Sequence, residues 1–108
     1  MHAFDVLADP VRRRILELLG EEDYLSGEVV DVIGDEFGIS QSAVSQHLKV
    51  LRDSGFATVT VDGPRRLYSL DPTPLAEIDD WINPFRRFWG SKMEALATEV
   101  ARGKRRRS

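Results

Sequence analysis

The sequence contains no cysteine, only two histidines and no apolar run long enough to cross a bilayer. Without cysteine, the chain has no disulfide framework, no thiol switch and no thiolate metal site. No secretory or lipidation signal opens the chain, so we expect a cytoplasmic protein that makes no membrane contact. The length of 108 residues predicts one ordinary domain, whose core is too small to enclose a large substrate site.

Residue patterns that carry catalysis are missing as well. No pair of carboxylates lies near a general base, no nucleophile lies on a glycine-flanked turn, and no glycine-rich phosphate loop occurs. The nearest candidate is His47 with Ser42 or Ser45, but these side chains would share one helix surface without an orienting partner. We therefore expect that the protein is not an enzyme and uses no cofactor.

The net charge of −3 is distributed unevenly along the chain. Residues 1–38 carry three basic and ten acidic side chains, residues 39–70 carry four and two, and residues 71–108 carry eight and six. A modestly positive segment within an acidic protein disfavours indiscriminate coating of nucleic acid. The distribution therefore favours site-specific contact through the middle of the chain.

Residues 40–54, SQSAVSQHLKVLRDS, have the pattern of a helix with one buried face. Val44, Leu48 and Leu51 recur at the i, i+4 and i+7 positions that share one side of a helix. Ser40 is placed to cap the N-terminus of this helix. The opposite side carries serine, glutamine and lysine, which can bond base edges in a DNA groove, although any solvated surface helix has a similar pattern.

The segments on both sides of this helix favour the DNA-reading interpretation. Upstream, an apolar segment predicts a shorter helix that ends in a turn at Phe37-Gly38-Ile39, as in a helix-turn-helix. Downstream, Gly55 predicts the end of the helix. Two strands are then expected at Phe56 to Val61 and Arg65 to Leu70, joined by a turn at Asp62-Gly63-Pro64. This order predicts a winged helix-turn-helix, a mainly α fold with a small β-hairpin.

In such a fold the helix enters the major groove of double-stranded DNA, and the wing reaches the backbone or the adjacent minor groove. The glutamine and serine side chains would read bases, while the cations would fix the protein on phosphates. The residues expected to contact DNA are Ser40, Gln41, Ser42, Ser45, Gln46, His47, Lys49, Arg52, Arg65 and Arg66.

Three stretches resemble the ArsR/SmtB family of small bacterial winged-helix repressors. They are LADP with the following RRRIL (residues 7–16), SQSAVSQHLKVLRDSG (residues 40–55) and RRLYSLDP (residues 65–72). The resemblance covers nearly the whole chain in the same order. It implies a homodimer that occupies a palindromic operator and leaves when an effector arrives.

Residues 73–102 form the second informative segment, because two tryptophans and two phenylalanines fall close together in it. Pro84 removes a backbone donor there and should kink the helix or split it near Ile82-Asn83. Aromatic and methionine side chains at helical spacing predict a dimer interface, with packing onto the chain's own domain as the alternative. With two residues of the N-terminal helix, the predicted interface comprises Phe4, Leu7, Ile78, Trp81, Ile82, Phe85, Phe88, Trp89, Met93 and Leu96.

Effector sensing has little support in the sequence. Metal-sensing members of the resembled family use cysteine before the recognition helix, or Asp and His on the last helix. Here the first segment lacks cysteine and the last helix lacks histidine, and carboxylates alone are poor ligands for zinc-like metals. We therefore expect no metal site. The aromatic tail is similar to that of a branch of the family that does not sense metals. An unidentified small molecule or protein concentration alone would then govern release from DNA.

The sequence thus predicts a winged helix-turn-helix over residues 1–72 and an aromatic dimerisation helix over residues 73–102 in the same compact domain. Residues 103–108 are expected to form a disordered basic tail. The predicted function is a homodimeric transcriptional repressor of an operator in or near its own promoter, held together by its N- and C-terminal helices. The alternative is a winged-helix module that binds another protein through the aromatic helix.

Overall fold

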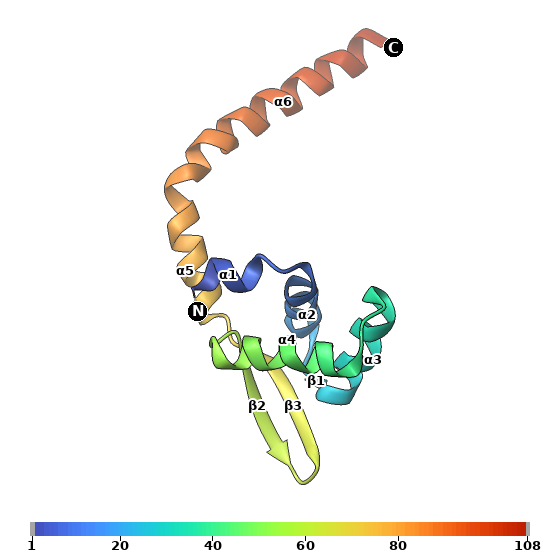
Figure 1. The fold of residues 1–108 in the computed structure, drawn as a ribbon. Helices are drawn as coiled ribbons and strands as arrows, with labels where there is room; N and C mark the ends of the chain where they lie inside the picture. Colours follow the sequence, from blue (N-terminus) through green and yellow to red (C-terminus); the bar gives the residue numbers. More distant parts are fainter. Residues whose placement is uncertain (1, 108) are drawn as a thin grey trace. The chain divides into compact units, whose positions relative to one another are not determined.

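The computed structural model describes residues 2–107, and the side chains of all of these except Ser91 and residues 101–107. The chain divides into a first unit that ends at Ile78 and a second unit that begins at Asp79. In chain order (Figure 1), the elements are α1 (Ala3–Leu7), α2 (Pro10–Glu21), β1 (Tyr24–Leu25), α3 (Ser26–Phe37), α4 (Gln41–Asp53), β2 (Ala57–Asp62), β3 (Arg65–Leu70), α5 (Thr73–Ile82), a 3-10 helix (Asn83–Phe85) and α6 (Arg86–Arg107). None of the described helices is long and apolar enough to span a membrane.

The turn between α1 and α2 is held by side chains of the segment DPVRR. The Asp9 carboxylate caps α2 by accepting the Val11 N–H at 2.8 Å, and Pro10 occupies the first helical position. The Arg12 Nε donates to the Val6 carbonyl at 2.8 Å, and an Arg13 guanidinium nitrogen donates to the Leu7 carbonyl at 2.6 Å. These two arginines therefore satisfy carbonyls at the end of α1, a role that a run of three arginines does not reveal by itself.

Asp9 makes the stability of this turn depend on pH. Partial burial raises the pKa of its carboxyl, but the N–H groups of Arg12 and Val11 and the nearby charges of His47 and Arg12 lower that pKa below its usual value. A lowered folded-state pKa contributes stability that is present above the unfolded pKa and is lost as the pH falls through the folded value.

We expect Asp9→Ala to reduce the free energy of unfolding by about 1 kcal/mol at neutral pH, because the cap is lost. The difference from the unmodified protein should narrow in acid, as the pH falls below the ordinary pKa of an aspartate and then through the lowered folded-state pKa of Asp9. Urea unfolding at several pH values measures both effects. Asp9→Asn keeps a capping oxygen without a titratable charge, so its advantage over Asp9→Ala should not vary with pH. If the difference in free energy of unfolding between the unmodified protein and Asp9→Ala stayed constant into strong acid, the ionised carboxylate of Asp9 would not be the stabilising cap.

A tight turn between α3 and α4 forms the helix-turn-helix, as the sequence predicts. Gly38 ends α3 with a φ of 63°, in the left-handed region where glycine is favoured. The Ile39 N–H returns to the Gly34 carbonyl at 3.2 Å. Ser40 then caps α4, its hydroxyl oxygen accepting the Ala43 N–H at 3.2 Å. The predicted cap and the predicted glycine turn are both confirmed.

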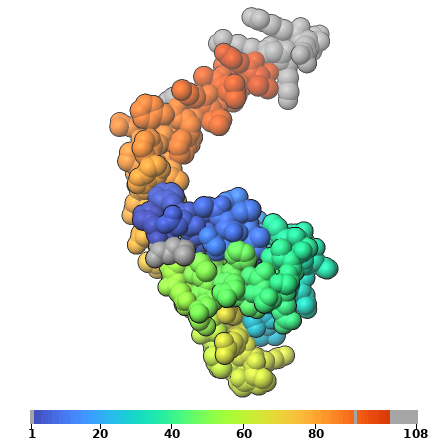
Figure 2. Space-filling model, viewed as in Figure 1, coloured from blue at the N-terminus to red at the C-terminus, as the bar shows by residue number. Residues whose placement is uncertain are grey.

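The wing is part of a small antiparallel sheet with the strand order β1-β3-β2. β2 and β3 pair from Ala57 opposite Leu70 to Asp62 opposite Arg65, and Gly63 with a φ of 58° lies in the turn between them. The hairpin projects from the helices of the first unit (Figure 2). The sequence predicts only two strands, and β1 corrects this prediction: Tyr24 and Leu25 pair with Tyr68 and Leu67 of β3.

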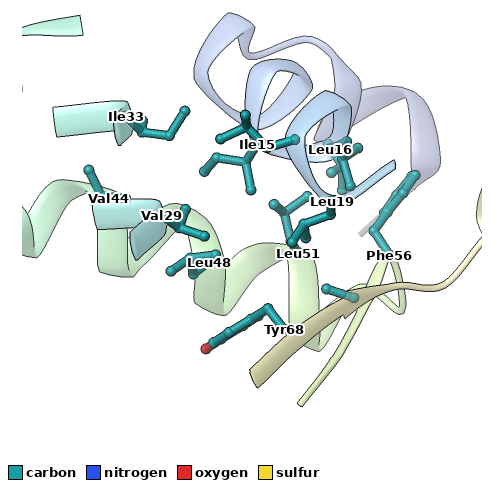
Figure 3. Packing of buried hydrophobic residues seen from close by; sticks show 13 residues of the cluster. Ile15, Leu16, Leu19, Val29, Ile33, Val44, Leu48, Leu51, Phe56 and Tyr68 are labelled. Atoms are coloured by element: carbon teal, nitrogen blue, oxygen red, sulfur yellow. The ribbon is translucent and has the colours of Figure 1, made fainter. Parts of the chain in front are cut away.

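The core of the first unit lies between α2, α3, α4 and the base of the sheet (Figure 3). Val44, Leu48 and Leu51 of α4 are all buried there, which confirms the predicted buried side of this helix. Phe56 is fully buried at the junction of α4 and β2. Because the inner side of α4 is fixed by this packing, its outer side has a defined orientation.

The second unit is helical. The 3-10 helix at Asn83–Phe85 separates α5 from α6, which confirms the predicted split at Ile82-Asn83. α6 continues to Arg107, past Gly103, where the sequence predicts that regular structure ends. Arginine and lysine are good helix formers and interact favourably with a helix C-terminus, while one internal glycine costs only about 1 kcal/mol. The side chains of the predicted basic tail lie outside the described residues.

Candidate nucleic-acid interface

The outer side of α4 gathers most of the residues predicted to contact DNA. A shallow open depression in the surface is lined by Ser40, Gln41, Ser42, Ser45, Gln46 and Lys49. All six are exposed. Five of them offer hydroxyl and amide groups at the N-terminal half of a helix, and Lys49 adds a cation one turn further along. The N-terminal half is the part of a recognition helix that contacts base edges when it enters the major groove.

The same surface shows how firmly its polar groups are positioned. The Ser40 hydroxyl lies 3.2 Å from the Ser42 hydroxyl while it caps the helix. The cap fixes the first turn of α4, so Gln41 and Ser42 emerge from a rigid backbone. Preorganised donors and acceptors of this kind lose little conformational entropy on binding.

His47 does not line this depression. Its side chain is half-buried on the flank of α4, close enough to Asp9 for its charge to lower the pKa of that carboxyl. His47 therefore faces the beginning of α2, apart from the other predicted DNA contacts. Arg52 is exposed near the end of α4, where its Nε lies 3.5 Å from the carboxylate of Asp53.

The two arginines of the wing lie on opposite sides of the hairpin, because side chains alternate along a strand. Arg66 and Tyr68 line a cleft together with residues of α4. Arg65 lines a separate, mostly apolar groove with Leu67 and Leu25. The sequence treats Arg65 and Arg66 as equivalent, whereas the structure brings only Arg66 next to α4.

Two residues beside the predicted site were missed by sequence reasoning. Ser26, the first residue of α3, and Tyr68 of β3 both line the cleft that contains Arg66 and Lys49. The two-residue alternation of β3 could have indicated Tyr68, since it lies two positions after Arg66. No local signal places Ser26 there, because it is far from both α4 and the wing along the sequence.

The residues predicted to form a dimer interface fall into two groups. Leu7 and Ile78 are partly buried and pack against the core of the first unit. Ile82 is half-buried, and the remaining members are exposed: Phe4, Trp81, Phe85, Phe88, Trp89, Met93 and Leu96. Within the second unit the rings of Trp81 and Phe85 lie 5.0 Å apart. In the part of the chain that the structure describes, no group of three or more His, Cys, Asp or Glu side chains could hold a metal ion.

Comparison with known sequences identifies relatives along most of the chain. The model of the bacterial regulatory proteins of the arsR family matches residues 9–59. The HTH-type transcriptional regulator Rv2034 of Mycobacterium tuberculosis is 39% identical over 95 residues, which cover 88% of this chain and 82% of that protein. The transcriptional repressor SdpR of Bacillus subtilis is 32% identical, over 78% of this chain and 89% of the repressor.

Solved structures agree with this assignment. The crystal structure of the ArsR family transcriptional regulator RHA00566 matches with a TM-score of 0.67 and 25% identity, over 82% of this chain and 88% of that one. The homodimeric winged helix-turn-helix DNA-binding domain Mb0332 of Mycobacterium bovis has the same fold, with a TM-score of 0.59 and 19% identity over 79% of this chain and 75% of its own. The chain therefore belongs to the ArsR family of bacterial transcriptional regulators and has their winged helix-turn-helix fold.

Proposed function

We propose that the protein is a homodimeric repressor that binds a palindromic operator in or near its own promoter. The observation that carries this proposal is the continuous surface of exposed hydroxyl and amide side chains along the first half of α4. In the proposed complex, Gln41, Ser42, Ser45 and Gln46 read bases, while Ser40, Lys49, Arg52, Arg65 and Arg66 bind phosphates. Repression follows because the bound dimer blocks polymerase from an overlapping promoter. The relative SdpR is a transcriptional repressor, which agrees with this direction of control.

Fluorescence anisotropy of the purified protein with its own upstream DNA and with a scrambled duplex tests this function. We expect tight binding to the upstream DNA alone and weaker binding as salt rises, because bound cations displace counterions from the phosphates. Equal and weak binding to both duplexes would contradict an operator near the gene.

Substitution of one glutamine and one arginine should separate base reading from backbone binding. We expect Gln46→Ala to reduce the preference for one base pair of the operator by about 1–3 kcal/mol, because it removes an amide from the reading surface. Arg65→Ala should weaken binding to all sequences alike and reduce the slope of affinity against salt by about one unit. Anisotropy on operator and random duplexes measures both effects. Equal losses for both variants on both duplexes would show that Gln46 does not read bases.

The exposed apolar side chains of the second unit support the proposed homodimer. Seven large apolar side chains between Trp81 and Val100 are 44% to 65% exposed. Within α6, Trp89, Met93, Leu96 and Val100 follow one another at intervals of four, three and four residues, the spacing of a seam between paired helices. A second copy of the chain would cover this seam, and Mb0332, with the same fold, is a homodimer.

A homodimer of this kind would place its two recognition helices about one DNA turn, roughly 34 Å, apart on a palindromic operator. Release from DNA would then depend on an unidentified small molecule or on protein concentration alone. We place the protein in the cytoplasm, where a bacterial regulator meets DNA. The other function considered from the sequence, a protein-docking module, is not favoured, because the relatives are regulators of transcription and a docking module has no need of the polar surface of α4.

A further inference from the structure

A cleft separates the recognition helix from the wing, beside the beginning of α3. Its volume is about 250 Å³, and we call it the α4–wing cleft. The polar side chains that line it are Ser26, Ser45, Lys49, Arg52, Arg66 and Tyr68. Three separate elements, α3, α4 and β3, thus contribute to one concave surface next to the reading side of α4.

The charge of the α4–wing cleft is uniformly positive. Lys49, Arg52 and Arg66 line it, and none of the lining residues is acidic. Arg52 has an exposed pairing with the adjacent Asp53, whereas Lys49 and Arg66 form no ion pair among the described residues. Two cations that lack counter-charges in one small cleft favour an anionic ligand.

Tyr68 provides a polar group at the floor of the cleft. The side chain is only 5% exposed, and its ring lies in the core beneath Leu48 while its hydroxyl oxygen points away from the other core residues (Figure 3). Among the described residues this hydroxyl forms no hydrogen bond. Every polar side-chain atom that is fully buried in the described part of the chain does have a hydrogen-bond partner, so the Tyr68 hydroxyl oxygen is not fully buried. The hydroxyl must therefore open into the cleft, where it is a donor without an acceptor.

The beginning of α3 contributes a third kind of attraction. The residue before the helix is Leu25, whose side chain cannot accept a hydrogen bond, and the structure contains no side-chain cap here. The carboxylate of Glu28 accepts the Leu25 N–H at 2.9 Å, outside the helical turn itself. The first N–H groups of this 12-residue helix therefore remain available beside Ser26, while the Glu28 carboxylate in the first turn already offsets part of the positive end of the helix dipole.

We propose that the α4–wing cleft binds one phosphate group of the DNA backbone, with Tyr68 and Ser26 donating hydrogen bonds and Lys49 and Arg66 neutralising its charge. The proposal rests on the proposed function, because a phosphate reaches this cleft only when α4 lies in the major groove. A phosphate held by three elements fixes the wing relative to the recognition helix. The cleft is thus a positioning site that sets the register of the protein on DNA.

Tyr68→Phe tests the proposal, because it removes the hydroxyl and keeps the buried ring. We expect the affinity for operator and random duplexes to fall about tenfold, as for the loss of a hydrogen bond to a charged group. The slope of affinity against salt should stay unchanged, since no charge is lost, whereas Lys49→Ala should reduce this slope by about one unit. Anisotropy at several salt concentrations measures affinity and slope together. Thermal unfolding of both proteins verifies that the fold is retained.

The other tyrosine of the chain is a matched control. Tyr24 lies opposite Tyr68 in the sheet but does not line the cleft, and burial and the charge of Glu22 raise its pKa. Tyr24→Phe should therefore bind DNA as the unmodified protein does. If Tyr68→Phe also binds with unmodified affinity, the cleft holds no phosphate and the proposed function stands. If the unmodified protein binds no duplex at all, the proposed function itself fails.

Inorganic phosphate distinguishes the DNA backbone from a free anion as the source of the ligand. Part of the sodium chloride is replaced by sodium phosphate at constant ionic strength during the DNA titration. We expect millimolar phosphate to leave the affinity for DNA unchanged, because an isolated anion lacks the other contacts of the duplex. If phosphate released the unmodified protein from DNA but did not release Tyr68→Phe, the cleft would be assigned to a free anion and the proposal would be overturned.

Discussion

Trp89→Glu is expected to convert the proposed dimer into monomers. The side chain of Trp89 lies at the start of the α6 seam and is 45% exposed in the single chain. A carboxylate at this position would have to be desolvated against the apolar side chains of a second copy. Large aromatic residues at interface centres contribute about 2 kcal/mol or more, so the dimer dissociation constant should rise by about two orders of magnitude. Light scattering or sedimentation over a range of protein concentrations measures this change.

The same substitution should weaken operator binding far more than it weakens binding to random DNA. A dimer on a palindrome binds its second half-site at a high effective concentration, an advantage of about 10²–10⁴ that a monomer loses. Arg87→Glu is a suitable control, since it adds a carboxylate on the opposite side of the same helix and should leave the dimer intact. If Trp89→Glu remains dimeric, the α6 seam is not the interface.

The fold was predictable where local signals determine it. Ser40 and Gly38 specify the turn of the helix-turn-helix through their own hydrogen-bonding and backbone preferences, and both are placed as the sequence predicts. Pro84 likewise separates α5 from α6 at the predicted position. In each case one residue type has a strong physical preference that distant contacts do not need to reinforce.

Features that depend on distant residues were not predictable. β1 contains two residues, too few for a periodic pattern, and exists because β3 offers backbone groups to Tyr24 and Leu25. Arg12 and Arg13 look like solvated side chains until the end of α1 is placed beside them. Local propensity contains no information about either contact.

The candidate site likewise has one part that follows from local sequence signals and another part that depends on contacts between distant residues. The exposed polar side of α4 follows from helical periodicity, and the structure gathers six of its predicted residues around one depression. The register of the hairpin determines that Arg66 faces α4 and that Arg65 lines the groove on the opposite side of the hairpin. Ser26 joins the cleft only after α3 and the wing have packed. The proposed base-reading surface is thus largely a local property of α4, whereas the proposed phosphate cleft is a property of the assembled fold.

Phe56 links the polar surface of α4 to the wing, because its side chain lies in the core between α4 and β2. Its side chain is completely buried, and its backbone N–H donates to the Leu51 carbonyl at 2.9 Å while its own carbonyl accepts the Asp71 N–H at 2.9 Å. We expect Phe56→Ala to lower the free energy of unfolding by about 3–5 kcal/mol, through lost burial and the cavity that remains. Such a loss is a large part of the total stability of an ordinary domain, about 5–15 kcal/mol.

Urea unfolding at one fixed protein concentration measures this effect, since the stability of a dimer depends on concentration. Val61→Ala is the matched control: it shortens an apolar side chain of the wing that is 65% exposed, and it should change stability by less than about 0.5 kcal/mol. In the folded fraction of Phe56→Ala, the cavity should also loosen the wing against α4, so DNA affinity should fall while the base preference that we propose α4 to determine remains. A variant with unchanged stability would show that Phe56 is not part of the core, and altered base preference would show that α4 itself depends on it.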